Sequence, residues 1–424
     1  IRDYDEQVGT VLAVQVENEP GMNAASVRDF SEKGTEAFEG AVPEAVIQAA
    51  KECREKAGAG RTDGTLDWQD ETHAVSGWLR EAWERNGCRE SGSWEEVFGS
   101  FGAELCMAWG TARYIDEIAE AGKRIYDIFM YVNVWLDGNG EKGWSLAGLD
   151  YPSGGAVSKA LPVWYAACSS LDCIAPDIYE GDPVSVQRIQ ALYDREGYAF
   201  YVPESGMSNV NASLMIAAAG RHNAAGYHVF GVDSFLDENG KLKERAEGIR
   251  HSFVMLDHAK ELLQRYAGTG KVYTLLQRVG QDSCRLALGD LVCRVSFVGA
   301  GADYAGWVAM DCRHGRDLPG INRVPQSLEE ELARGLLFQA GEKEFYLVGH
   351  KVRLYWQRLR MDGSIPANQL NIPHQSYNME LLAIEEGHFE EGVFVVDRKR
   401  SGDEARHGIW AQYDCGVIHF ILGE

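Results

Sequence analysis

Two glutamates, Glu19 and Glu204, each stand at the end of an apolar run with the composition of a β-strand. Glu19 belongs to the Asn-Glu-Pro tripeptide that ends VLAVQVENEP, and Glu204 ends YAFYVPE just before a Ser-Gly pair that can turn the chain sharply. Retaining cleavage of a glycosidic bond needs two carboxyl groups roughly 5 Å apart. One, with a raised pKa, protonates the leaving oxygen, and the other attacks the anomeric carbon. We predict Glu19 as the acid/base and Glu204 as the nucleophile.

Each glutamate also has an ordinary structural interpretation, Glu19 as a polar strand end and Glu204 as a helix cap. Their shared position favours the catalytic pair, because functional side chains gather at the carboxyl ends of parallel strands. Asn18, beside the acid, can hydrogen-bond the sugar 2-hydroxyl, a contact that strengthens in the transition state. Glu17 lies two residues before Glu19 on the same side, so its charge could raise the pKa of the acid. A salt bridge from Glu17 to a Lys or Arg is the alternative.

The elements that must position these side chains follow a β-α-β-α order. Near-continuous apolar runs predict strands buried on both faces, at 11–16, 126–135, 171–179, 198–203 and 226–232. Helical periodicity predicts helices at 44–57, 76–86, 103–122, 184–195, 209–225 and 244–266. The stretch between the first two strands is too long for one crossover helix and predicts an excursion of several helices. This order favours a parallel sheet in an α/β fold, either a barrel or doubly wound.

The pattern of the chain changes near residue 270. Short alternating runs separated by Gly, Asp and Asn turns follow, namely VYTLLQ, CRLALGD, LVCRVSF, KEFYLVG, KVRLYW, GVFVVD and GVIHFIL. Such runs predict an antiparallel β-sandwich. We therefore expect a catalytic domain over 1–269 and a C-terminal β-sandwich domain over 270–424.

Composition excludes several classes of function. The formal net charge of −23 argues against binding to nucleic acid or to an anionic membrane, since both need a basic surface. No apolar stretch reaches membrane-spanning length. The 11 His show no H-x-x-x-H spacing, so we expect no metal and no other cofactor.

The number and spacing of the cysteines indicate the cellular compartment of the protein. Their number, nine, is odd, and no C-x-x-C pair occurs, which indicates reduced, buried thiols and favours the cytoplasm. An extracytoplasmic location stays open, because the chain begins with Ile1 and a leader could precede it.

Long motifs carry a resemblance to a known family. They are VQVENEPGM, SGSWEEVFG, MAWGTARYIDEIAEAGK, MYVNVWL, YPSGGAVSKALPVW, APDIYEGD and VPESG. In them the chain resembles the bacterial β-galactosidase-like enzymes related to glycoside hydrolase family 35, in the clan A (β/α)8 barrel group. The segment EEGHFEEGVFVVDRKRSGDEARHGIW resembles the end of the C-terminal β-domain of uncharacterised function in these proteins. The resemblance covers nearly the whole chain.

The resemblance implies roles for the catalytic residues. It implies Glu19 as acid/base, Asn18 as its neighbour at the sugar 2-hydroxyl, and Glu204 as nucleophile. Tyr179, ending the sixth barrel strand, is placed to hydrogen-bond the nucleophile. Asp177 should face the same side, with a structural carboxylate at a loop start as the alternative.

Further residues should line the sugar site by the same resemblance. Asn133 and Trp135 end the fifth strand, and a place in the core is the alternative for Trp135. Phe230 and Asp233 end the eighth strand. His228 departs from the family pattern there, and either changes a subsite or fills the barrel.

The resemblance also implies that the first strand of this chain is strand four of the barrel. Strands one to three are then expected before Ile1, in a truncated reading frame or a longer protein, and the fragment alone could be inactive. The expected activity is a retaining β-glycosidase on β-linked oligosaccharides or glycosides, with β-galactosides favoured. Another β-linked sugar and a non-catalytic carbohydrate-binding protein are the alternatives.

Overall fold

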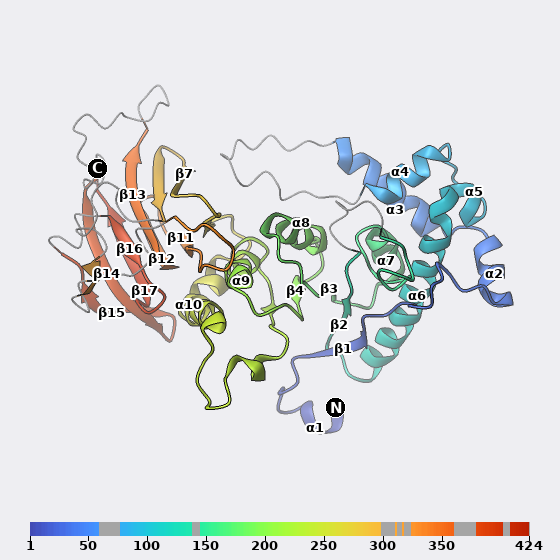
Figure 1. Ribbon diagram of the computed structural model, residues 1–424, viewed down its shortest axis with the longest axis horizontal. Helices are drawn as coiled ribbons and strands as arrows, with labels where there is room; N and C mark the ends of the chain where they lie inside the picture. Colours follow the sequence, from blue (N-terminus) through green and yellow to red (C-terminus); the bar gives the residue numbers. More distant parts are fainter. Residues whose placement is uncertain are drawn as a thin grey trace. The chain divides into compact units, whose positions relative to one another are not determined.

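The computed structural model describes residues 1–58, 77–137, 145–297, 310–311, 316–317, 324–359, 379–401 and 408–423. The chain divides into two compact units (Figure 1). The first contains the described residues up to Ser205 together with Ala224–Val229. The second contains Gly206–Asn223 and the described residues from Phe230 onward.

The strands of the first unit are parallel, as their apolar runs predict. They are β1 (Ala13–Asn18), β2 (Phe129–Val134), β3 (Cys173–Pro176), β4 (Tyr201–Val202) and β5 (Gly226–Tyr227). One sheet has the order β1-β2-β3, and β4 pairs with β5. A parallel bridge between Ile178 and Ser205 joins the chain just after β3 to the chain just after β4. The described strands of this unit do not close into one barrel sheet.

Helices separate these strands. Before β2 they are α1 (Arg2–Asp5), α2 (Glu32–Glu39), α3 (Glu44–Gly58), α4 (Trp78–Arg85), α5 (Trp94–Phe98), the 3-10 turn η1 (Gly99–Phe101) and α6 (Gly102–Ile125). After it come α7 (Leu161–Ala167) and α8 (Pro183–Tyr193). The described residues between α2 and β2 therefore contain four helices and one 3-10 turn, which confirms the predicted helical excursion. Helix α6 buries Leu105, Ala108, Ala112 and Ile115 along one stripe, as an amphipathic helix does.

The described residues of the second unit form two large antiparallel sheets and one short one. The six-stranded sheet has the order β15-β14-β17-β12-β11-β6 and the four-stranded sheet β16-β13-β8-β7. These strands are β6 (Val272–Leu276), β7 (Ser283–Leu288), β8 (Leu291–Ser296), β11 (Arg334–Gln339), β12 (Glu344–His350), β13 (Val352–Arg358), β14 (Leu381–Glu390), β15 (Val393–Lys399), β16 (Ile409–Ala411) and β17 (Val417–Leu422). The short strands β9 (Met310–Asp311) and β10 (Arg316–Asp317) pair with each other. Side chains of both large sheets share one hydrophobic core, which includes Cys293, Trp356 and Phe420.

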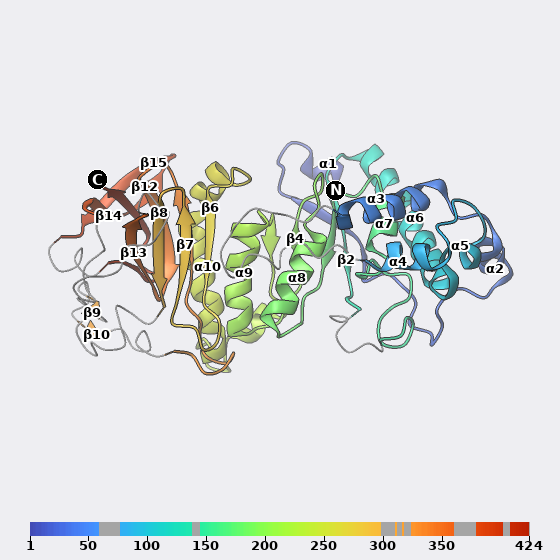
Figure 2. The same cartoon turned by 90° about the horizontal axis from the view of Figure 1, so that it is seen from above.

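Two helices cover the other face of the six-stranded sheet. They are α9 (Asn209–Arg221) and α10 (Glu244–Tyr266), and a 3-10 turn, η2 (Val232–Phe235), lies between them in the chain. Both helices lie side by side against this sheet (Figure 2). Ile216 and Met255 share a core cluster with Leu336 and Val348 of the sheet.

The predicted boundary near residue 270 falls between the C-terminal end of α10 and the start of β6. The compact units divide the chain differently, because α9 and α10 pack on the sheet that follows them. As a boundary between domains, residue 270 stays a prediction.

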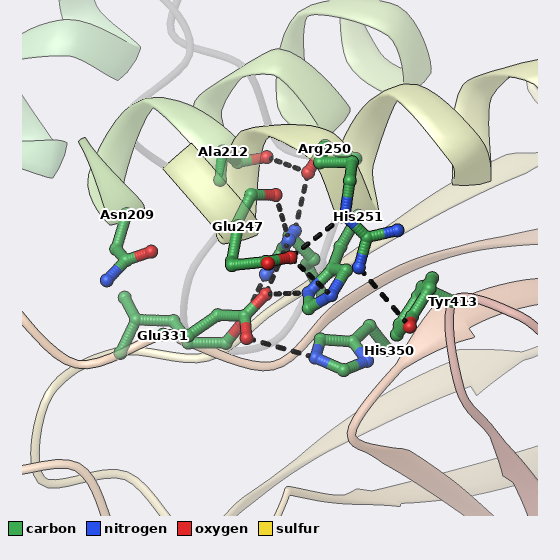
Figure 3. Close-up of polar contacts among 12 residues, drawn as sticks. Asn209, Ala212, Glu247, Arg250, His251, Glu331, His350 and Tyr413 are labelled. Atoms are coloured by element: carbon green, nitrogen blue, oxygen red, sulfur yellow. Dashed lines mark hydrogen bonds and ion pairs between the residues drawn. The ribbon is translucent and has the colours of Figure 1, made fainter. Parts of the chain in front are cut away.

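A buried ion-pair cluster joins α10 to β11 and β12 (Figure 3). The Arg334 guanidinium is fully buried and donates to Ser252 Oγ at 2.7 Å, to Gly248 O at 2.6 Å and to Glu331 Oε1 at 2.9 Å. Glu331 Oε1 also lies 2.8 Å from His251 Nδ1. Burial raises the pKa of Glu331, but hydrogen bonds from His251 and His350 and the charge of Arg334 outweigh it and hold that pKa well below its usual range. Glu331 is therefore the counterion that lets Arg334 be buried.

Eight of the nine cysteines lie in the described residues, and none of these eight takes part in a disulfide. Five of them are buried, namely Cys53, Cys168, Cys173, Cys293 and Cys415. Cys312 lies outside the described residues. In the part of the chain that the structure describes, no helix combines the length and the apolar character needed to cross a bilayer.

Removing the Glu331 charge should destabilise the second unit. In Glu331→Gln the buried Arg334 loses its counterion, so we expect the free energy of unfolding to fall by about 3–5 kcal/mol. Denaturant unfolding followed by far-UV circular dichroism measures this loss. Glu390→Gln is the matched control, since Glu390 pairs with His388 but is largely exposed. A loss no larger than that of the control would contradict the assigned role.

Candidate functional site

The amide of Asn133 holds three strand ends together. Its Oδ1 accepts from the Glu19 backbone N–H at 3.0 Å. Its Nδ2 donates to Asn18 Oδ1 at 3.1 Å and to Asp177 Oδ2 at 2.8 Å. Asn133 is completely buried. The structure therefore places it beneath the site, where all its polar atoms are used by protein, and this replaces the predicted contact with the sugar.

The backbone at Glu19 has an unusual conformation. Its φ is 44°, in the left-handed region that a non-glycine residue adopts at some cost in free energy. The hydrogen bond from its N–H to Asn133 offsets that cost. Two residues later, Gly21 has φ 150°, and a Cβ there would lie 2.5 Å from Pro152 Cβ. The turn after β1 is thus closely packed, and it directs Glu19 toward the ends of the neighbouring strands.

Glu204 follows β4, and Tyr179 follows β3. The Tyr179 hydroxyl donates to Glu204 Oε2 at 2.6 Å, which confirms the predicted hydrogen bond. The backbone of the same two loops is joined, because the Ile178 N–H donates to Glu204 O at 2.8 Å. Glu204 is therefore held by one hydrogen bond to its side chain and by another to its backbone.

The predicted catalytic residues meet at one open pocket of about 470 Å³. Carboxyl groups and aromatic or apolar side chains line it, namely Glu19, Asp177, Glu180, Glu204, Trp135, Tyr179, Leu136 and Ile189. Trp135 is 45% exposed, so the alternative of a core position is wrong. Among the described residues that line this pocket there is no Lys, Arg or His.

Two carboxyl groups of the pocket, those of Asp177 and Glu19, have a raised pKa. Burial, the charge of Glu204 and the neighbouring Glu19 raise the pKa of Asp177 to about 9. Burial also raises the pKa of Glu19, as does the Glu204 charge, while a hydrogen bond with Asp177 opposes the change. A carboxylic acid beside a carboxylate is the pairing that glycoside hydrolysis uses.

Two of the predicted neighbours lie elsewhere. Glu17 accepts a hydrogen bond from the Tyr114 hydroxyl at 3.2 Å. The charge that raises the pKa of Glu19 comes from Glu204, so the predicted effect of Glu17 on that pKa is wrong. Tyr114, and no Lys or Arg among the described residues, is the partner of Glu17. Asn18 is exposed and lines an adjoining pocket of about 650 Å³, which shares Glu19 with the first. That pocket was not predicted, because many of its lining residues come from α2 and α6, which are distant from Asn18 in the chain.

His228 belongs to a row of rings within the first unit. Its ring lies edge-on to Tyr201 with centroids 5.2 Å apart, and Tyr201 lies edge-on to Tyr131 at 5.0 Å. This packing favours the interpretation that His228 fills space between neighbouring side chains and does not change a subsite. Phe230 is exposed and lies in the second unit, so its place at the site stays a prediction.

One group of side chains in the described residues has ligand atoms close enough to hold a metal ion. His251, Glu331 and His350 of the second unit have such atoms within 4.8 Å of one another. The sequence did not predict this group, because its members are distant in the chain. Arg334 and Lys351 already bind the same carboxylate, at 2.9 and 3.6 Å. Because a divalent cation would add positive charge beside two cations, we interpret the group as structural.

Residues 249–412 match a protein family described as "Domain of unknown function (DUF5597)". The matched stretch runs from within α10 to just beyond β16, and its description states no activity. Among curated proteins, none matches the chain.

Removal of the Asn133 amide should destabilise the first unit. Asn133→Ala removes three hydrogen bonds and leaves the Glu19 N–H and Asp177 Oδ2 without partners in a buried place. We expect the free energy of unfolding to fall by about 2–4 kcal/mol. Denaturant unfolding followed by tryptophan fluorescence measures this change. Asn23→Ala is the control, since Asn23 is exposed and lines neither of these two pockets; equal losses in the two variants would refute the supporting role of Asn133.

Proposed function

We propose that this chain carries the catalytic carboxyls of a retaining glycoside hydrolase that removes terminal β-linked sugars, with β-galactosides favoured. Glu19 is the acid/base and Glu204 the nucleophile. The observation that carries the proposal is the convergence of Glu19, Asp177 and Glu204, from the ends of three strands, on one open pocket. The hydrogen bond from Tyr179 to Glu204 supports it further.

The reaction proceeds in two displacements. Glu204 attacks the anomeric carbon and forms a carbon–oxygen bond, while the glycosidic bond breaks and Glu19 gives its proton to the leaving oxygen. Glu19, now a carboxylate, takes a proton from water as the water oxygen attacks the same carbon and releases Glu204. Trp135 and Tyr179 offer exposed ring surface on which a sugar can pack. The carboxylate separation of roughly 5 Å that retention requires stays a prediction.

We also propose membership in the β-galactosidase-like enzymes related to glycoside hydrolase family 35. In that case β1 to β5 correspond to strands four to eight of a (β/α)8 barrel, and the antiparallel sheets to the appended β-domain. The parallel order β1-β2-β3, the pairing of β4 with β5 and the bridge after β3 and β4 support this assignment. The lack of disulfides among the described cysteines favours a reducing compartment such as the cytoplasm.

Substitution of the two glutamates tests the mechanism. Glu19→Gln should lower kcat by about 10²–10⁴-fold on aryl β-galactosides with poor leaving groups, because these need protonation, and far less on a dinitrophenyl galactoside. A 2-deoxy-2-fluoro galactosyl fluoride should label Glu204, as peptide mass spectrometry would detect. Glu196→Gln, exposed and outside the pocket, is the matched control. Hydrolysis that persists unchanged in Glu204→Gln would remove Glu204 as nucleophile.

The charge of the pocket predicts its selectivity. Two like charges 5 Å apart repel by about 3 kcal/mol at an effective dielectric constant of 20, which is roughly a hundredfold in kcat/KM. A sugar carboxylate would meet Glu204 with no lining cation to balance it. We expect aryl β-galactosides to be cleaved at least a hundredfold more efficiently than the matching galacturonides. Comparable kcat/KM values at neutral pH would show that the pocket does not select by charge.

A further inference from the structure

The pocket holds a third carboxyl, Asp177, that the two displacements do not use. Asp177 follows β3 and is only 4% exposed. Its Oδ2 accepts the hydrogen bond from Asn133 Nδ2. Its Oδ1 is buried and receives no hydrogen bond from any group in the described residues. An ionised carboxylate oxygen in such a place would carry a large desolvation cost.

The Glu19 carboxyl lines the same pocket as Asp177. A hydrogen bond between the two side chains is one of the causes that raise the pKa of Asp177, and it opposes the burial that raises the pKa of Glu19. Ionised carboxylates only accept hydrogen bonds, so a bond between two carboxyl groups requires a proton on one of them. Glu204 is a further negative neighbour of both groups. No cation lines the pocket in the part of the chain that is described. Glu19 gives its proton to the leaving oxygen during the proposed reaction, so the pair keeps a hydrogen bond throughout turnover only where Asp177 carries a second proton.

We propose that Asp177 is a positioning residue that keeps its own proton through turnover and donates a hydrogen bond from Oδ1 to the Glu19 carboxyl. This inference rests on the proposed function. When Glu19 gives its proton to the leaving oxygen, the hydrogen bond from Asp177 stabilises the carboxylate that remains. When water returns a proton to Glu19, Asp177 still carries its own. The raised pKa of Asp177, caused by burial and by Glu204, agrees with this state at neutral pH.

Asp177→Asn distinguishes a proton donor from an anion. In that variant the amide oxygen can still accept from Asn133, and the amide nitrogen can still donate to Glu19. We expect kcat/KM at pH 7 to stay within tenfold of the wild type. In Asp177→Leu, which has no donor, we expect a loss of a hundredfold or more. The fall in activity at alkaline pH should also move to higher pH in Asp177→Leu, because Glu19 loses the donor that lowers its pKa.

A role for Asp177 as an anion, for example as an acceptor for a sugar hydroxyl, gives the opposite result. Asp177→Asn would then lose as much activity as Asp177→Leu, and the proposal would be overturned. Thermal unfolding of both variants shows whether a loss of activity reflects a loss of fold.

Infrared spectroscopy tests the proton without any assay of activity. At pH 7 the difference between wild type and Asp177→Asn should contain the carbonyl stretch of one protonated carboxylic acid, which disappears from the wild type as the pH rises through about 9. Glu204→Gln should keep this band. A missing band overturns the inference even where galactosides are cleaved. A band without cleavage of any glycoside supports the proton on Asp177 and overturns the proposed function.

Discussion

The hydrogen bonds of the Asn133 amide are the contacts on which the pocket depends. They tie the loop after β1 to the ends of β2 and β3 from a completely buried position. A buried amide must satisfy its donors and its acceptor within the protein, so its partners cannot move independently. The unusual φ of Glu19 follows from this constraint, because its N–H must turn toward the amide oxygen. The backbone contact between the loops after β3 and β4 extends the same support to Glu204.

The pKa values of buried carboxyl groups are shifted in opposite directions in the two units. Glu331 lies among Arg334, Lys351 and two histidines, and its pKa is lowered. Asp177 lies among other carboxyls with no lining cation, and its pKa is raised. A buried carboxyl group is therefore stabilised as a carboxylate beside the Arg334 guanidinium, and as a protonated carboxylic acid beside other carboxyl groups. The first arrangement stabilises a fold, and the second suits proton transfer.

Much of the secondary structure could be predicted from the sequence, and the failures have physical causes. The runs ending at Glu19 and Glu204 lie in or beside β1 and β4, and the helices over 103–122 and 244–266 match α6 and α10. Strand β14 was not predicted, because Glu385 and Glu386 interrupt its apolar pattern. Only the fold brings Lys399, Arg398 and Arg400 opposite them, where ion pairs make the charges compatible with a sheet.

By itself the sequence determined which residues stand at strand ends, since local apolar patterning is a property of neighbouring residues. That was enough to select Glu19 and Glu204, and the resemblance to a known family added Tyr179, Asp177 and Trp135, which line the same pocket. Only the tertiary structure decided that Asn133 lies beneath the pocket, that Glu17 bonds to Tyr114, and that His251 and His350 meet at Glu331. Burial and hydrogen-bond partners depend on residues far apart in the chain. For the same reason, the oxygen of Asp177 that lacks a donor could be recognised only in the folded protein.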